Sequence, residues 1–170
     1  VSSSIPNEGK STVAINLGSA LGQVKNTLII DADMRRPTLA KTFADNPQQA
    51  GLSELVAGSA SIEDCIVQSN NAGASFLFSG LVPSNPLELL SSNRFKEVLA
   101  ELRERFDCIV IDSPPLALVS DAMELVKFAD ATMYVVRQNY SKKGMLSIIN
   151  DKYKNGEIKH VSCLVHFLPV

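Results

Sequence analysis

The sequence has 170 residues, of which 45% are hydrophobic and 6% aromatic, and its formal net charge is −2. This charge excludes the strongly basic surface that nucleic-acid binding needs, and no apolar run reaches the ~18 residues of a membrane-spanning helix. We therefore expect one soluble domain over residues 1–170 with an aliphatic core. Its cysteines, Cys65, Cys108 and Cys163, lack metal-ligand spacing and are expected to be reduced core residues.

The first functional pattern lies between a short predicted strand, Val1–Ser3, and a predicted helix from Thr12 to Gln23. The loop between them ends in Gly-Lys-Ser-Thr (9–12), the phosphate-binding end of the P-loop pattern G-x-x-x-x-G-K-[ST]. Ser4 stands where the pattern has its first glycine. Taken alone, this match could also be an ordinary helix N-terminus. Other motifs in the chain are needed to distinguish this alternative from a phosphate-binding loop.

A P-loop suits a triphosphate for a physical reason. Its successive backbone N–H groups point at the negatively charged oxygens, and the N-terminus of the following helix adds a favourable dipole. Gly9 lets the backbone approach the phosphates, and Lys10 can reach the β- and γ-phosphate oxygens as a point charge. The Ser11 hydroxyl is placed to ligate Mg²⁺.

The next predicted strand, Thr27–Ile30, is apolar throughout and ends in two acids, Asp31 and Asp33. An uninterrupted apolar run indicates a strand that is buried on both faces, as in a parallel sheet. We expect Pro37 to begin a helix that runs to Phe43.

The rest of the chain alternates strands with helices. The predicted strands cover residues 75–80, 108–111, 131–137 and 161–167. The predicted helices and helical turns cover residues 52–56, 62–67, 87–90, 94–106, 121–128 and 143–153. This alternation predicts an α/β fold with a doubly wound, mostly parallel sheet flanked by helices, as in P-loop nucleoside triphosphatases.

Acids close two of these strands, at the sheet edge where open α/β sheets bind ligands. Asp31 and Asp33 follow one strand, and Asp112 ends the apolar run Cys108–Ile111 as a Walker B acid does. A buried carboxylate is costly unless it has a partner, and nucleotide-bound Mg²⁺ supplies a cation. Each aspartate alone could be a helix cap or a turn residue. Three of them beside a Gly-Lys-Ser-Thr loop favour a magnesium–nucleotide site.

Four motifs stand out along the chain. They are Gly-Lys-Ser-Thr (9–12), Leu-Ile-Ile-Asp-Ala-Asp-Met-Arg-Arg-Pro (28–37), Pro-Ser-Asn-Pro-Leu-Glu-Leu-Leu (83–90) and Ile-Asp-Ser-Pro-Pro (111–115). Together they resemble the bacterial tyrosine kinases (BY-kinases), the cytoplasmic kinase domains of polysaccharide co-polymerases within the MinD/ParA-like P-loop ATPases. The resemblance implies an ATP- and Mg²⁺-dependent protein-tyrosine autokinase that regulates the polymerisation and export of capsular polysaccharide or exopolysaccharide.

The resemblance also implies roles for individual residues. Lys10 and the loop amides hold the phosphates, and Asp31 is the base that orients or deprotonates the acceptor tyrosine. Ser11 and Asp33 ligate Mg²⁺ with support from Asp112. The nucleotide-binding residues implied in this way are Pro6, Asn7, Glu8, Gly9, Lys10, Ser11, Thr12 (on the α-phosphate) and Arg137.

Partners follow from the same resemblance. It implies an inner-membrane activator segment, fused or separate, a ring of subunits in the intact protein, and a tyrosine phosphatase, at the cytoplasmic face of the bacterial inner membrane. Nucleic acid is not an expected partner. Arg35, Arg36 and the loop at 83–86 would contact a subunit or the activator, or would form a solvated loop. The family's N-terminal docking helix and tyrosine-rich tail are not in the sequence, which we expect to be a fragment.

Two other functions stay open. A MinD/ParA-type ATPase switch is one, although the extra lysine usual early in that group's P-loop is missing at Asn7 or nearby. A nucleotide-binding scaffold without kinase activity is the other. His166 falls near an asparagine that reads adenine in relatives, and it could contact the base or be an ordinary edge histidine. Of the tyrosines, we expect Tyr134 in the core and Tyr140 and Tyr153 at the surface.

Overall fold

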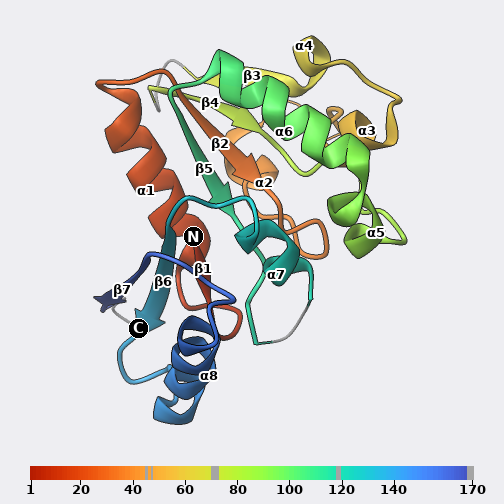
Figure 1. Cartoon of the computed structure of the whole chain (residues 1–170). Coiled ribbons are helices and arrows are strands. Elements are labelled where there is room, and N and C mark those ends of the chain that lie inside the picture. Colours follow the sequence, from red (N-terminus) through yellow and green to blue (C-terminus); the bar gives the residue numbers. More distant parts are fainter. Residues whose placement is uncertain (45, 47, 70–72, 118–119, 168–170) are drawn as a thin grey trace.

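The computed structural model describes residues 1–44, 46, 48–69, 73–117 and 120–167 (Figure 1). The strands in these residues are β1 (Ser2–Ser3), β2 (Thr27–Asp31), β3 (Ile66–Ser69), β4 (Ala74–Leu77), β5 (Cys108–Asp112), β6 (Thr132–Arg137) and β7 (Val161–His166). The helices are α1 (Lys10–Gly22), α2 (Ala40–Phe43), α3 (Leu52–Ala57), α4 (Ile62–Cys65), α5 (Pro86–Ser91), α6 (Asn93–Arg105), α7 (Asp121–Val126) and α8 (Lys143–Lys154).

The strands form two parallel groups that meet at the start of the chain. Their orders are β3-β4-β2-β5 and β1-β6-β7, and only β3 among the paired strands of the described residues runs antiparallel to its neighbour. The amino group of Val1 donates to the carbonyl of Ile111 at 2.6 Å, and the amide of Ser113 donates to the carbonyl of Val1 at 3.1 Å. These bonds join β5 to β1. The predicted doubly wound, mostly parallel α/β fold is therefore confirmed.

Two local predictions are wrong at their boundaries. The helical turn expected over residues 62–67 ends at Cys65, and Ile66–Ser69 forms β3, which pairs with β4. Residues 66–69 form a strand because they pair with the free edge of β4. The local sequence does not show that this edge is free. The helix expected from Pro37 begins at Ala40, because the backbone N–H groups of Thr38 and Leu39 donate to Asp31 instead of continuing a helix.

The side chains of β2 alternate between two hydrophobic clusters, as a strand buried on both faces requires. Leu28 and Ile30 pack into the cluster that carries the apolar faces of α3, α5 and α6. Ile29 packs with Phe76 and Phe78 on the other face, against residues of α1 and α2. In Figure 1, α6 lies across the upper strands while α8 covers β6 further down. The two clusters therefore lie on opposite faces of the sheet that contains β2 and β4.

The edge strand β7 is less covered than the sequence suggests. Cys163 on β7 is exposed, so the expectation of three core cysteines is wrong for this residue, although Cys65 is buried and Cys108 half-buried. Val165 and Phe167 are 62% and 73% exposed. Buried Tyr134 and exposed Tyr140 and Tyr153 agree with prediction. In the described part of the chain, no helix combines the length and the apolar character that crossing a bilayer demands.

Helix α1 approaches the sheet closely at Gly18. A Cβ atom at this position would lie 2.4 Å from Cγ1 of Ile29, a distance that real Cβ contacts do not reach. Ile29 is fully buried, so it has little room to move. The glycine is therefore what lets α1 sit directly on β2, and α1 in turn carries Lys10 and Ser11 at its first turn.

Replacing Gly18 by alanine should lower the free energy of unfolding by about 1–3 kcal/mol, because the added methyl group overlaps Ile29. Gly144 in α8 is a matched control, since nothing lies within 4 Å of an added Cβ there. Alanine at Gly144 should raise the free energy of unfolding by up to about 1 kcal/mol. Urea unfolding followed by circular dichroism measures both changes. Equal effects of the two substitutions would contradict this explanation.

Candidate active site

The loop between β1 and α1 turns through two residues with left-handed backbone conformation. Asn7 has φ of 64° and Gly9 has φ of 87°. At Gly9, an added Cβ atom would also lie 2.7 Å from Nε2 of His166. Conformation and space therefore both favour glycine at this position. The loop leads directly into α1, so its backbone N–H groups and the helix N-terminus face the same side.

The serine in place of the first P-loop glycine has a partner of its own. Ser4 is buried, and its hydroxyl is hydrogen-bonded to the hydroxyl of Tyr134 in β6. Burial raises the pKa of Tyr134, and the bond to Ser4 offsets part of this rise. The serine that replaces the first glycine of the pattern thus bonds the start of the loop to β6.

Glu8 supports the loop from behind instead of facing a ligand. Its side chain is fully buried, accepts from the backbone N–H of Ile5 at 2.8 Å, and accepts from the hydroxyl of Ser141. Nε2 of His166 donates to the carbonyl oxygen of Glu8 at 2.6 Å. Glu8 can therefore reach a phosphate only through its backbone N–H. His166 is satisfied by the P-loop backbone, which is the edge-histidine alternative for this residue.

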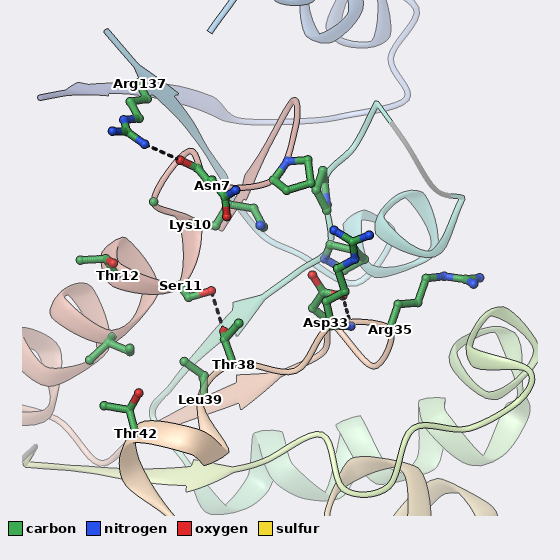
Figure 2. A pocket seen from close by; sticks show the side chains of 16 residues that line it. Asn7, Lys10, Ser11, Thr12, Asp33, Arg35, Thr38, Leu39, Thr42 and Arg137 are labelled. Carbon is green, nitrogen blue, oxygen red and sulfur yellow. Dashed lines mark hydrogen bonds between the residues drawn. The ribbon is translucent and has the colours of Figure 1, made fainter. Parts of the chain in front are cut away.

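The P-loop borders a cavity of about 720 Å³ (Figure 2), a size in the range of small-molecule sites. Of the residues predicted to bind the nucleotide or Mg²⁺, those on its wall are Pro6, Asn7, Gly9, Lys10, Ser11, Thr12, Asp33 and Arg137. Glu8, Asp31 and Asp112 lie behind the wall. The sequence reading missed Ile15, Thr38, Leu39, Thr42, Pro114 and Pro115, which also line the cavity with Arg35 and Arg36.

Arg137 lies over the P-loop at the end of β6. Its guanidinium donates to the carbonyl of Asn7 at 3.2 Å, and its Cζ lies 5.0 Å from the ring centre of Tyr140, close enough for a cation–π contact. Figure 2 shows this side chain reaching the loop from the strand beside it. Arg137 therefore holds a positive charge at the loop without an acidic partner among the described residues.

Asp31 and Asp112 are neighbours at the ends of adjacent strands. They are register partners in the β2–β5 pair, and neither is more than 1% exposed. Asp31 accepts the backbone N–H groups of Asp33, Thr38 and Leu39 at 3.1–3.3 Å. Burial and the neighbouring charge of Asp112 together raise the pKa of Asp31 to about 7, although the three backbone N–H groups oppose the rise. Asp31 can therefore exchange a proton near neutral pH.

Asp112 has no such support. Neither carboxylate oxygen has a hydrogen-bond partner within 3.5 Å among the described residues, although the side chain is buried. Burial raises its pKa, and the nearby Ser11 hydroxyl and Lys10 ammonium lower it only in part. A buried carboxylate without partners is rare in folded proteins, and a nearby cation is one way to offset its cost.

These residues fit Mg²⁺ that is held together with a nucleotide. Ser11 and Asp33 face the cavity in front of the orphaned Asp112. Burial raises the pKa of Asp33, which the Arg36 amide and Lys10 partly offset. In the described part of the chain, no three His, Cys, Asp or Glu side chains could hold a metal by themselves. Mg²⁺ normally keeps waters and phosphate oxygens among its ligands, so two protein ligands suffice.

The loop after β2 is tied to α7 by a two-pronged ion pair. Nε of Arg35 donates to Oδ2 of Asp121 at 2.6 Å, and its Nη2 donates to Oδ1 at 3.2 Å. The Asp121 side chain is 2% exposed and that of Arg35 is 45% exposed. Arg35 is therefore occupied within the chain, whereas Arg36 is exposed, and the loop that carries Asp33 is fixed from its outer side.

The comparisons with known proteins define the class. A family model described as an AAA domain matches residues 7–159, so the chain belongs to this family. The tyrosine-protein kinase ptk of Acinetobacter johnsonii is 36% identical over 160 residues, which is 94% of this chain and 22% of that protein. The tyrosine-protein kinase YwqD of Bacillus subtilis is 37% identical over 145 residues, which is 84% of this chain and 60% of that protein.

Solved structures show the same likeness. The crystal structure of the VpsO kinase domain aligns with a TM-score of 0.94 at 36% identity, over 99% of this chain and 83% of that chain. The cell-division ATPase MinD of Pyrococcus furiosus aligns less well, with a TM-score of 0.76 at 25% identity, over 95% of this chain and 67% of that chain. The resemblance to bacterial tyrosine kinases is thus confirmed, and the family's P-loop implies nucleotide binding. The chain spans 22% to 60% of the length of ptk and YwqD.

Substitutions at two buried aspartates test whether the unpartnered carboxylate of Asp112 destabilises the protein. Asp112→Asn should raise the free energy of unfolding of the ligand-free protein by about 1–3 kcal/mol, because it removes a buried charge without a partner. Asp121→Asn should lower it by about 1–2 kcal/mol, because it breaks the pair with half-exposed Arg35. Urea unfolding at neutral pH in EDTA measures both. Destabilisation by both substitutions would argue against a cation position beside Asp112.

Proposed function

We propose that the chain is an ATP- and Mg²⁺-dependent protein-tyrosine kinase domain that phosphorylates tyrosines of its own protein. The observation that carries the proposal is the convergence of Lys10, Ser11 and Asp33 on one cavity, with the unpartnered Asp112 directly behind them. Phosphoryl transfer depends mainly on positioning and on neutralising charge, and this arrangement supplies both. The similarity to proteins named tyrosine-protein kinases supports the choice of acceptor.

In this proposal, the P-loop amides and Lys10 bind the β- and γ-phosphates, and Thr12 bonds the α-phosphate. Ser11 and Asp33 hold Mg²⁺, and Asp112 stabilises it from behind. The bound cation would neutralise charge that develops on the transferred phosphoryl group. Arg137 adds a fixed positive charge above the loop, where its side chain already contacts Asn7.

Asp31 is the proposed base for the acceptor tyrosine. Its pKa of about 7 suits a group that takes a proton at neutral pH. Asp31 is fully buried, however, and its carboxylate accepts backbone N–H groups from the loop that lies over it. A tyrosine hydroxyl would therefore reach Asp31 only after the loop between Asp33 and Leu39 shifts. The proposal includes this movement as a step that precedes transfer.

The physiological role is also a proposal, and it rests on the family resemblance. The kinase would regulate the polymerisation and export of capsular polysaccharide or exopolysaccharide at the cytoplasmic face of the bacterial inner membrane. Its partners would be an inner-membrane activator segment, further copies of the protein in a ring, and a tyrosine phosphatase. Arg36, Ser84 and Asn85 are exposed positions through which such contacts could form.

The alternatives are a MinD/ParA-type ATPase switch and a nucleotide-binding scaffold without kinase activity. The comparison structures do not favour the first, because the VpsO kinase domain aligns with a TM-score of 0.94 and MinD with 0.76. An ATPase switch would release phosphate and form no phosphotyrosine. A scaffold would bind the nucleotide and do neither. These three outcomes can be separated in one experiment.

The full-length protein should incorporate label from γ-³²P ATP into tyrosine. Lys10→Met should reduce this incorporation by roughly a hundredfold or more, because it removes the charge that faces the phosphates. Asp31→Asn should reduce it by about 10²–10⁴-fold if Asp31 is the base. Phosphoamino-acid analysis and released phosphate are measured together.

The controls use exposed residues of the same types. Lys25→Met and Asp130→Asn lie outside the cavity wall and should leave incorporation within about twofold of the unmodified protein. Phosphotyrosine at full level in Lys10→Met would refute the proposed role of the P-loop. Phosphate release without phosphotyrosine in the unmodified protein would favour the ATPase switch instead.

A further inference from the structure

A side-chain contact joins the loop after β2 to the P-loop. The hydroxyl of Thr38 donates to Oγ of Ser11 at 3.1 Å, and Figure 2 shows the two side chains facing each other at the cavity wall. Thr38 belongs to neither the P-loop pattern nor the acidic strand ends, so sequence reading gave it no role. Its contact is with the residue proposed to ligate Mg²⁺.

The position of Thr38 is fixed although its side chain is exposed. Its backbone N–H donates to Oδ2 of Asp31 at 3.2 Å, and the N–H of Leu39 donates to the same oxygen at 3.1 Å. Asp31 is itself buried at the end of β2, and Leu39 is buried in the core. The Thr38 hydroxyl is therefore presented to Ser11 by a backbone that is anchored on both sides.

The bonding capacity of a hydroxyl group shows what this contact does. A serine hydroxyl has one proton to donate and two sites at which it can accept. Thr38 fills one accepting site of Ser11, which leaves the other site and the proton. Because Ser11 and Thr38 both line the cavity, the remaining accepting site of the Ser11 hydroxyl is left for a cation there.

We propose that Thr38 is a positioning residue for the metal: it orients the Ser11 hydroxyl so that a free lone pair faces the divalent cation. The inference rests on the proposed binding of nucleotide with Mg²⁺ at this cavity. Without the Thr38 hydroxyl, Ser11 is free to rotate and loses orientation that it would otherwise bring to the cation. The loss falls on metal-dependent binding, because the Thr38 side chain is hydrogen-bonded to Ser11 and not to the P-loop backbone amides proposed to receive the phosphates.

The test measures equilibrium binding, so it does not depend on turnover. The protein is titrated calorimetrically with the non-hydrolysable β,γ-imido analogue of ATP, once in excess Mg²⁺ and once in EDTA. Thr38→Val keeps the shape and removes the hydroxyl, whereas Thr38→Ser keeps the hydroxyl. Thr132→Val is the control for the same chemical change, because Thr132 lies in β6 outside the cavity wall and makes no hydrogen bond to Ser11.

Thr38→Val should weaken binding about three- to tenfold in Mg²⁺, the size expected for one lost hydrogen bond, and should leave binding in EDTA unchanged. Thr38→Ser and Thr132→Val should stay within about twofold of the unmodified protein in both buffers. Thermal unfolding by circular dichroism checks that each variant folds, and Thr38→Ala serves as a second variant that lacks the hydroxyl.

The outcomes separate this inference from the proposed function. Unchanged binding by Thr38→Val and Thr38→Ala in Mg²⁺ would overturn it, and so would equal weakening in both buffers, which would indicate general loosening of the loop. Weak binding by Thr38→Ser would also overturn it, because the hydroxyl would then not be the cause. If the unmodified protein binds the analogue in neither buffer, the proposed function itself is refuted.

Discussion

The structure depends on two carboxylates that the sheet forces together. Parallel register between β2 and β5 places Asp31 opposite Asp112, and both side chains are buried. Burial raises the pKa values of both carboxyl groups, and a neighbouring charge adds to each rise: that of Asp112 at Asp31, and that of Asp33 at Asp112. Asp31 is stabilised by backbone N–H groups, whereas Asp112 is left without a partner among the described residues. A cation beside Asp112 would remove this cost.

The surroundings of this pair are fixed by contacts between distant parts of the chain. Ser4 is bonded to Tyr134, and Glu8 is bonded to Ser141, which lies 133 residues further along the chain. On the opposite side, Arg35 is paired with Asp121. The P-loop and the loop after β2 are therefore both held by contacts within the chain itself. Such preorganisation is what phosphoryl transfer needs, because the protein contributes mainly position and charge.

The sequence predicts the centre of the site better than its supports. Lys10, Ser11 and Asp33 could be placed together because the carboxyl ends of parallel strands meet at one edge of a sheet. The part played by Glu8 could not be foreseen, because its partner Ser141 lies in a distant loop, between β6 and α8. Thr38 was missed for the same reason. Strand β3 and the exposure of Cys163 depend on which strands become sheet edges, and local patterns do not contain that information.

The burial of Asp31 bears on how a kinase of this design would be controlled. The loop that covers Asp31 also carries Asp33, contacts Ser11 through Thr38, and is fastened to α7 through Arg35. Asp31 cannot be uncovered without disturbing residues proposed to hold the metal. The base and the metal site are thus coupled through one short segment. A partner that contacted this segment, on which Arg36 is exposed, would act on both at once, and proton transfer could then be made to wait for assembly.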